Sequence, residues 1–192
     1  MAVLDSAHVD TFTREHLPDH ELWPDLIFTL PELDYPQRLN CGDELLDATI
    51  ARLGGERPCL RTDTETWSYE ALRRRVNQVA HVLVDDLGVV PGNRVLLRGP
   101  NTPWGVACWL AVMKVGAVAV ATMPLLREAE LRPIIDKALP AAALCDARFR
   151  ADLGALTPAF AVVPYGSEDA EDLCRLSDAR SPDFESVATA AT

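Results

Sequence analysis

The sequence predicts an α/β fold: a mostly parallel sheet with helices on both faces, preceded by a proline-rich arm, a helix and a small hairpin. Two observations lead to this prediction. Between residues 94 and 163, short apolar runs alternate with helix-length segments, which is typical of parallel strands joined by crossover helices. The chain also has 192 residues, 48% hydrophobic content and a mean hydropathy of +0.03, enough length and apolar character to bury one core.

Residues 1–40 form the predicted N-terminal arm. Prolines interrupt this segment often enough to exclude long helices or strands: Pro18, Pro24, Pro31 and Pro36. One short helix is expected near residues 13–15, and a turn at residues 23–24. The apolar residues that follow lead us to expect that the arm packs on another surface: Trp23, Leu26, Ile27 and Phe28.

Two helices and a hairpin are expected next. Asp43 is predicted to cap a helix that ends at Gly54 and has one apolar face, made of Leu45, Leu46, Thr49, Ile50 and Leu53. Residues 59–62 and 65–67 flank a polar turn and predict the hairpin. Ser68 is predicted to cap a helix that ends at Gly88 and buries Leu72, Val76, Val79, Ala80, Leu83 and Leu87. We interpret Arg73, Arg74 and Arg75 as a solvated face of that helix.

The α/β body is predicted to span residues 41–165. Strands are expected at residues 94–98, 117–121, 141–145 and 160–163. Thr102 with Pro103 indicates the start of a helix that is apolar all round and therefore buried, with Gly116 at its end. A further helix is expected at residues 129–139, where Pro133 requires a late start or a kink. Residues 166–192 form an acidic C-terminal segment, partly helical near residues 170–176 or frayed.

Charge and cysteine content exclude several classes of protein. The formal net charge of -11 lies mostly in the two ends of the chain, which argues against a nucleic-acid partner. Five cysteines without a CxxC pair indicate reduced thiols in a cytoplasmic protein. The first residues lack a signal-peptide pattern. Residues 104–123 are apolar, but Lys114 and Gly116 interrupt them, so we expect no membrane span.

Two loops after predicted strands are the candidate binding site, because ligands of open parallel sheets bind at the carboxyl ends of the strands. The first loop contains Asn101 and Thr102, and the second begins at Thr122 and ends at Arg127. Arg127 is suited to a phosphate or a carboxylate. The alternative, which we favour because surface arginines are common, is that Arg127 pairs with Glu128 or Glu130 or lies in water.

Other candidate chemistry is weaker. His16 and His20 lie four residues apart among carboxylates, but Pro18 spoils the helical face that a metal site would use. Cys108 lies in the apolar helix and is interpreted as a buried thiol and not as a nucleophile. The sequence contains neither GxxxxGK[ST] nor GxGxxG, so the usual phosphate loop and dinucleotide fingerprint are absent from it.

Three segments resemble the N-terminal part of the adenylate-forming superfamily, which includes acyl-CoA ligases, luciferases and peptide-synthetase adenylation domains. Residues 67–72 read W-S-Y-E-A-L and are similar to the family's T-Y-x-E-L helix start. Residues 89–101 are similar to its G-V-x-x-G-D-R-V strand. Residues 110–124 are similar to its L-A-x-x-K-A-G-A-V-x-V-P-x-x-P segment, the most specific of the three. Residues 108–131 and 34–47 look most similar to benzoate- and 2-aminobenzoate-type CoA ligases.

The resemblance, which covers residues 33–161, implies a two-step reaction. A carboxylate attacks the α-phosphate of ATP with Mg²⁺ to give an acyl-adenylate, and the thiol of CoA then displaces AMP. The family's Ser/Thr/Gly-rich loop, its aromatic-Gly-x-Thr-Glu motif and its C-terminal lysine are not found in this sequence. The resemblance therefore implies an N-terminal fragment, either an expressed piece or a truncated reading frame, without catalytic residues and inactive alone. It also places Arg127 near a residue that touches a CoA phosphate in some members.

Two other functions are kept open. The chain could be a non-catalytic binding or scaffold module that keeps the subdomain fold and pairs with a separate ligase fragment, and restored activity in such a complex would favour this. A flavodoxin-like anion-binding domain is the third alternative, which co-purifying flavin would support. As a fragment, the chain is expected to bind no cofactor tightly, to need the missing C-terminal part of the ligase, and to self-associate through the surface left uncovered.

Overall fold

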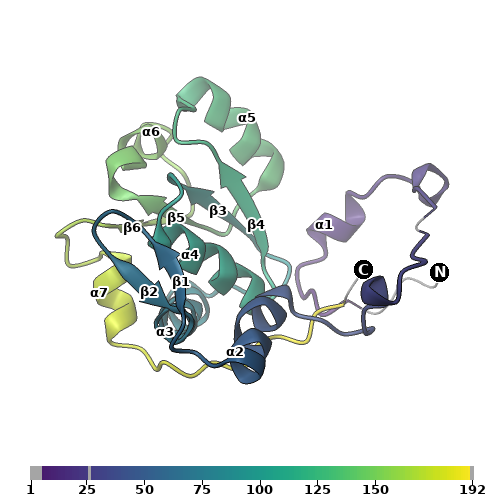
Figure 1. Cartoon of the computed structure of the whole chain (residues 1–192). Helices are drawn as coiled ribbons and strands as arrows, with labels where there is room; N and C mark the ends of the chain where they lie inside the picture. The colour runs from purple at the N-terminus through teal and green to yellow at the C-terminus, as the bar shows by residue number, and fades with distance from the viewer. Residues whose placement is uncertain (1–5, 26, 191–192) are drawn as a thin grey trace.

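The computed structural model describes residues 6–25 and 27–190 and has the predicted α/β fold (Figure 1). The strands are β1 (Pro58–Arg61), β2 (Thr66–Ser68), β3 (Arg94–Arg98), β4 (Val118–Thr122), β5 (Ala142–Asp146) and β6 (Ala161–Tyr165). The α-helices are α1 (Phe12–Glu15), α2 (Ala48–Leu53), α3 (Tyr69–His81), α4 (Pro103–Lys114), α5 (Glu128–Ala138), α6 (Arg150–Gly154) and α7 (Leu173–Asp178). Short π-helical turns precede α2 at Asp43–Asp47 and follow α3 at Val82–Asp86.

The main sheet is parallel, with strand order β4-β3-β5-β6. Arg98 at the end of β3 is in register with Thr122 of β4 on one side and with Cys145 of β5 on the other. The chain therefore leaves β3 toward β4, then crosses back over it to β5. That reversal places a topological switch point between β3 and β5, where open α/β sheets bind their ligands.

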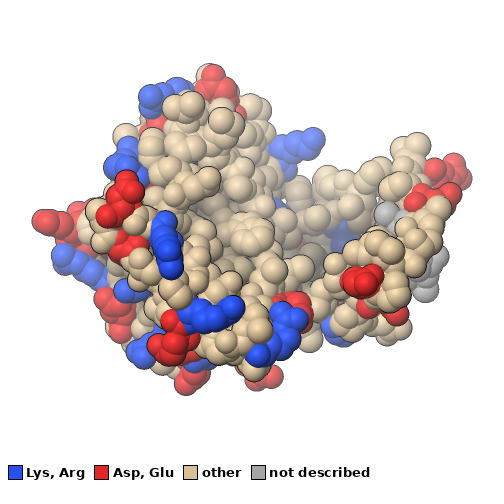
Figure 2. All heavy atoms as spheres, viewed as in Figure 1, with Lys and Arg blue, Asp and Glu red and all other residues tan. Residues whose placement is uncertain are grey.

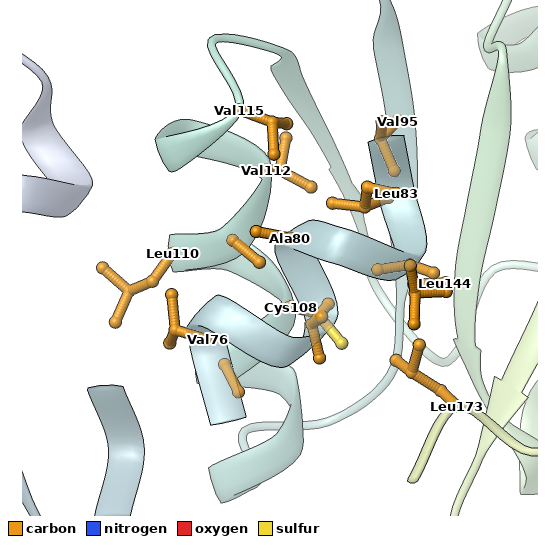
Figure 3. Packing of buried hydrophobic residues seen from close by; sticks show 14 of the residues in the cluster. Val76, Ala80, Leu83, Val95, Cys108, Leu110, Val112, Val115, Leu144 and Leu173 are labelled. Atoms are coloured by element: carbon orange, nitrogen blue, oxygen red, sulfur yellow. The ribbon is translucent and has the colours of Figure 1, made fainter. Parts of the chain in front are cut away.

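Helices cover both faces of this sheet, as predicted. On one face, α3 and α4 pack together over the strands with α7 beside them, and Val76, Ala80, Cys108, Val112 and Leu144 interdigitate in the larger core (Figure 3). On the other face, α5 and α6 cover a smaller cluster of fully buried residues, made of Leu96, Leu131, Ala143, Cys145 and Leu153. The candidate site lies at the carboxyl edge between these two layers.

The predicted helix starts at Ser68 and Thr102 are confirmed. The backbone N–H of Ala71 donates to Ser68 Oγ at 3.1 Å, and that of Gly105 donates to Thr102 Oγ1 at 3.1 Å. These bonds satisfy donors that the first turn of a helix leaves unpaired. Gly116 follows α4 with φ +71°, a left-handed conformation that suits glycine.

The predicted cap at Asp43 is wrong. The Asn40 side chain begins the helix instead, since its Oδ1 accepts hydrogen bonds from the backbone of Gly42 and Asp43. Its Nδ2 also donates to carbonyls of α4 and of the C-terminal segment, which explains why an amide occupies this position. Leu46 is buried as expected, whereas Leu45 and Leu53 are exposed because the π-helical turn rotates the apolar face.

Two further details differ from the prediction. The α5 helix does not start late: it begins at Glu128 and contains Pro133, whose missing N–H leaves out one helical hydrogen bond. Only Arg74 of the arginine triplet is exposed; Arg75 lies over the rings of Trp67 and Trp104, with its guanidinium carbon 4.8 Å and 5.0 Å from the ring centroids. The face interpreted as solvated therefore carries a cation–π contact.

The N-terminal arm is tied to the body where it meets the start of β3. Backbone N–H groups of Val9 and Asp10 donate to Pro91 O, and the Asp10 carboxylate accepts from Asn93 and Arg94. A Cβ on Gly92 would lie 2.2 Å from Asp10 O, so this close approach requires glycine.

The middle of the arm does not pack on the body, contrary to our expectation. Trp23 is partly exposed, Ile27 is 78% exposed and Phe28 is 55% exposed, while Leu26 lies outside the described residues. In Figure 1 the arm projects away from the sheet, and Figure 2 shows acidic side chains at its outer end and both acidic and basic ones over the body. An exposed apolar segment of this kind is a surface on which another protein segment can pack.

The end of the chain forms an ordered C-terminal strap, which we define as residues 181–190. Asn77 Nδ2 donates to Pro182 O at 2.8 Å, and Val187 N donates to Lys114 O at 2.9 Å. Leu39 N donates to Thr189 O at 2.9 Å, and the Thr189 hydroxyl returns a bond to Leu39 O. The strap thus joins α3, α4 and the end of the arm.

Candidate functional site

The candidate site is a hollow of about 220 Å³ at the carboxyl ends of β3 and β4, beside the N-terminus of α4. Its walls are mostly apolar and its rim is polar. The lining residues are Leu97, Arg98, Gly99, Pro100, Asn101, Gly105, Val106, Cys108, Trp109, Ala121, Thr122, Leu144 and Tyr165. A partly apolar hollow at the switch point of a parallel sheet is the usual place for a small-molecule ligand.

The loop after β3 approaches β6 closely because residue 99 is glycine. A Cβ there would lie 2.2 Å from Tyr165 Oη and 3.0 Å from Asp146 Cβ. Tyr165 is almost fully buried, and that burial raises the pKa of its hydroxyl well above the ordinary value. The hydroxyl stays protonated at neutral pH and can act only as a hydrogen-bonding group.

The cysteines around the hollow are also held in the thiol form. Burial raises the pKa of Cys108 far above its usual range and raises the pKa of Cys145 to about 12. A thiol that does not ionise is a poor nucleophile. The interpretation of Cys108 as a buried, inert thiol therefore agrees with its surroundings.

Arg98 is the one buried cation of this edge, and it lies at the point where β3 ends. Its side chain donates to three carbonyls of the loop after β4, those of Met123, Pro124 and Leu126, at 3.0, 3.2 and 2.6 Å. It also pairs with Asp152 at the start of α6, at 2.8 Å. The guanidinium thereby holds together the segments that follow β3, β4 and β5.

Arg127 ends the loop that follows β4, and 71% of its side chain is exposed. Its Nη1 lies 3.2 Å from both carboxylate oxygens of Asp152. Its backbone N–H donates to Glu130 Oε2 at 2.9 Å, while Glu128 pairs with Arg132. The expected side-chain pairing with Glu128 or Glu130 is therefore wrong: the guanidinium, largely exposed to solvent, pairs with Asp152.

The structure brings only some of the predicted site residues together. Asn101 and Thr122 line the hollow, and Asn101 is exposed at its rim. The hydroxyl of Thr122 donates to Leu97 O at 3.1 Å, and that of Thr102 is occupied in capping α4. Arg127 is not among the residues that line the hollow. Arg98, Asp152 and Tyr165 were not predicted. Arg98 and Tyr165 end apolar strands, whose pattern does not indicate the contacts of the last residue, and Asp152 lies in the short helix α6, which was not expected.

The metal site considered for His16 and His20 has no support from their contacts. His16 Nδ1 lies 2.7 Å from Phe12 O, and its ring stacks on Phe12, while the ring of His20 stacks on Trp23.

No helix in the described ranges is long and apolar enough to cross a membrane.

Comparison with known proteins places these features in a family. The family model of the AMP-binding enzymes matches residues 46–189, most of the chain. The benzoate–CoA ligase of Thauera aromatica is 30% identical over 105 residues, which are 53% of this chain and 19% of that protein. The 2-succinylbenzoate–CoA ligase of Escherichia coli is 32% identical over 112 residues, which are 58% of this chain and 21% of that protein.

Solved structures have the same fold. The anthranilate CoA ligase AuaEII in complex with anthranoyl-AMP superposes with a TM-score of 0.73 at 19% identity, over 82% of this chain and 31% of that one. A benzoate CoA ligase from Burkholderia xenovorans superposes with a TM-score of 0.67 at 24% identity, over 80% of this chain and 30% of that one. The chain thus spans about a fifth of the length of its curated relatives and under a third of these ligase structures. The match of the family model over residues 46–189 shows that the chain belongs to the AMP-binding enzyme family.

Proposed function

We propose that this chain is the N-terminal part of an ATP-dependent ligase that joins an aromatic carboxylic acid, such as benzoate or 2-aminobenzoate, to CoA. The observation that carries the proposal is the family match over residues 46–189, together with relatives named as benzoate- and 3-hydroxybenzoate–CoA ligases. The reaction converts carboxylate, ATP and CoA to acyl-CoA, AMP and diphosphate. The acid attacks the α-phosphate with loss of diphosphate, and the CoA thiol then displaces AMP from the acyl-adenylate.

The part of this chain in that reaction is to form one wall of the site. Asn101 and Thr122 lie on the wall of the hollow, and Arg127, five residues after Thr122, has an exposed guanidinium. A planar guanidinium suits the phosphate groups of CoA. We propose that Arg127 exchanges its pairing with Asp152 for a CoA phosphate, which an exposed ion pair can do at little cost.

ATP and Mg²⁺ are proposed to be held outside this chain. The sequence contains no Ser/Thr/Gly-rich phosphate loop, and residues 6–25 and 27–190 offer no cluster of three carboxylate, histidine or cysteine side chains placed for a metal ion. When bound, Mg²⁺ and ATP would supply the activated phosphate and its charge neutralisation. The chain alone is therefore expected to be inactive.

The test is thioester formation from ATP, benzoate or 2-aminobenzoate, and CoA, measured for the chain alone and for the chain mixed with the downstream part of a benzoate–CoA ligase. Activity of the mixture only is the expected result. Activity of the chain alone would contradict the assignment as an incomplete ligase. No activity in the mixture, despite a stable complex, would favour a non-catalytic scaffold module.

The exposed apolar arm supports a second part of the proposal, that the downstream part of the ligase packs there and that the isolated chain self-associates in its absence. Leu22, Ile27, Phe28 and Leu30 are exposed on the arm, and Met123 and Leu125 are exposed beside β4, an edge strand without charged residues. Uncharged edge strands and apolar patches promote association. Light scattering should show species larger than a monomer, and a monomer at high concentration would refute self-association.

The cysteines support a proposal about the compartment. All five cysteines are free thiols, and three of them are only partly buried or exposed, which supports a reducing environment. We propose that the protein acts in the cytoplasm. Fractionation of cells that express it would check this.

A further inference from the structure

Arg98 is an unusual residue for its position. It ends β3, in the centre of the sheet, and only 1% of its surface is exposed. A charged side chain is rarely buried to this extent without a dedicated set of partners. The run RVLLR also contains a second arginine, Arg94, at the opposite end of the same strand, which provides an internal comparison.

Each nitrogen of the Arg98 guanidinium has at least one acceptor in the segments that follow β4 and β5. Its Nε donates to Phe149 O at 3.2 Å and its Nη1 to Met123 O at 3.0 Å. Its Nη2 faces Pro124 O at 3.2 Å, Leu126 O at 2.6 Å and Asp152 Oδ2 at 2.8 Å. Three of these five acceptors are backbone carbonyls of residues 123–126, which we call the site-edge loop.

Asp152 links this buried arginine to the exposed one. Its carboxylate accepts from Arg98 at 2.8 Å and from Arg127 at 3.2 Å. The hydrogen bond from Arg98 is the main reason that the pKa of Asp152 lies below its ordinary value. Because Arg98 remains in place, Asp152 keeps one partner when Arg127 turns away from it. Arg127 is thus free to bind an anion without leaving a carboxylate unpaired.

We infer that Arg98 is a positioning residue of the ligase site: it fixes the site-edge loop and Asp152 and so presents Arg127 at a constant place for a phosphate group of CoA. The loop has few bonds of its own. Leu126 N donates to Met123 O, and the next backbone contacts begin at Arg127, where α5 starts. The binding of a CoA phosphate by Arg127 rests on the proposed function, whereas the role of Arg98 in fixing the loop does not.

Arg94 shows what a purely structural arginine does in the same strand. It is also buried, and its Nε and Nη2 donate to Ala138 O at 2.8 Å and to Leu139 O at 2.9 Å, while Nη1 pairs with Asp10 of the arm. All these contacts lie at the amino edge of the sheet, away from the site. Arg94→Lys is therefore the matched control for Arg98→Lys.

The first experiment measures amide hydrogen exchange by mass spectrometry over residues 123–131 in the chain as it stands. Lysine keeps the charge of Arg98 but cannot reach several carbonyls at once. Arg98→Lys should therefore speed exchange in the site-edge loop about tenfold, the size expected when one net hydrogen bond is lost. Arg94→Lys should leave that loop as in the wild type, although both variants lower the melting temperature.

A surface variant keeps the inference testable if Arg98→Lys folds poorly. Arg127→Ala removes only the exposed partner of Asp152, so the loop should exchange as in the wild type. Faster amide exchange in the site-edge loop of Arg127→Ala would show that Arg98 does not fix the loop. Wild-type exchange in that loop of a folded Arg98→Lys would show the same, and either result would overturn the inference.

The second experiment uses the ligase completed with its downstream part. Arg98→Lys should raise KM for CoA about tenfold, as expected for a displaced charge-assisted contact, and leave kcat within about twofold. Arg94→Lys should change neither. If Arg127 binds the 3′-phosphate of CoA, the wild type and Arg98→Lys should have the same KM for dephospho-CoA, which lacks that phosphate. A wild type without any ligase activity would refute the proposed function, while the exchange result would still decide the role of Arg98.

Discussion

Substitution of the buried Lys114 by methionine should reveal how much the two contacts of its ammonium group contribute to the free energy of unfolding. The ammonium is fully buried, 2.8 Å from Asn77 Oδ1 and 2.5 Å from Asp47 Oδ2. Methionine replaces the apolar stem, so little cavity forms. The lost charge-assisted bond to Asn77 is worth about 2 kcal/mol, and leaving Asp47, whose side chain is 26% exposed, without its partner adds about 1 kcal/mol.

The expected loss is therefore about 3 kcal/mol of the free energy of unfolding, a large part of the 5–15 kcal/mol that is typical of a domain. Urea unfolding followed by far-UV circular dichroism measures it. Lys137, exposed on α5, provides the control, and Lys137→Met should change stability by less than about 0.5 kcal/mol. A loss below about 1 kcal/mol in Lys114→Met would refute the reasoning that this contact is desolvated.

Three other predictions follow from single contacts. Gly99→Ala should lower the free energy of unfolding by about 2 kcal/mol, because the new methyl group meets Tyr165 Oη. Adding Tyr165→Phe should recover part of this stability in urea unfolding. Equal losses in Gly99→Ala and in the double variant would contradict the prediction. Burial alone would raise the pKa of Asp172, but hydrogen bonds from Ser167 and Cys174 outweigh it and hold that pKa below the ordinary value. The stability that Asp172 contributes is thus complete above about pH 4 and is lost as the pH falls through its folded pKa. Asp172→Asn should therefore make the free energy of unfolding depend less steeply on pH in the acid range. The same dependence on pH in the variant and the wild type would count against this. Cys41 is exposed and should react first with a thiol reagent, whereas Cys108 should react only in denaturant; early labelling of Cys108 in a peptide map would disprove its burial.

Local signals in the sequence predicted much of the fold. Ser68 and Thr102 were identified as helix caps because a cap is decided by the residues next to it. The strands were placed within a residue or two for the same reason, since each is a short apolar run between turns. Their pairing order, and hence the switch point, follows from chain connectivity that periodicity alone does not specify.

Contacts distant in the sequence explain what could not be predicted. Asn40 caps its helix in place of Asp43 because it also bonds to Lys114 and Val187, which lie 74 and 147 residues further along the chain. Arg98 reads as the end of an apolar strand, and its five acceptors come together only when the loop after β4 and the segment after β5 are folded beside it. The arm was expected to pack because its residues are apolar, but composition cannot say whether the packing partner is present.

The C-terminal strap has a consequence for how this chain folds during synthesis. Residues 39 and 189 bond to each other across 150 positions, and the amide of Asn40 donates to Val187 O as well as to carbonyls at the end of α4. Contacts of such long range close slowly and late. The helix that follows Asn40 is synthesised long before Val187, so its local cap can form before the bond that ties Asn40 to the strap. During that interval the α3 and α4 surfaces that receive the strap are open to solvent, and the nascent chain is a natural client for chaperones.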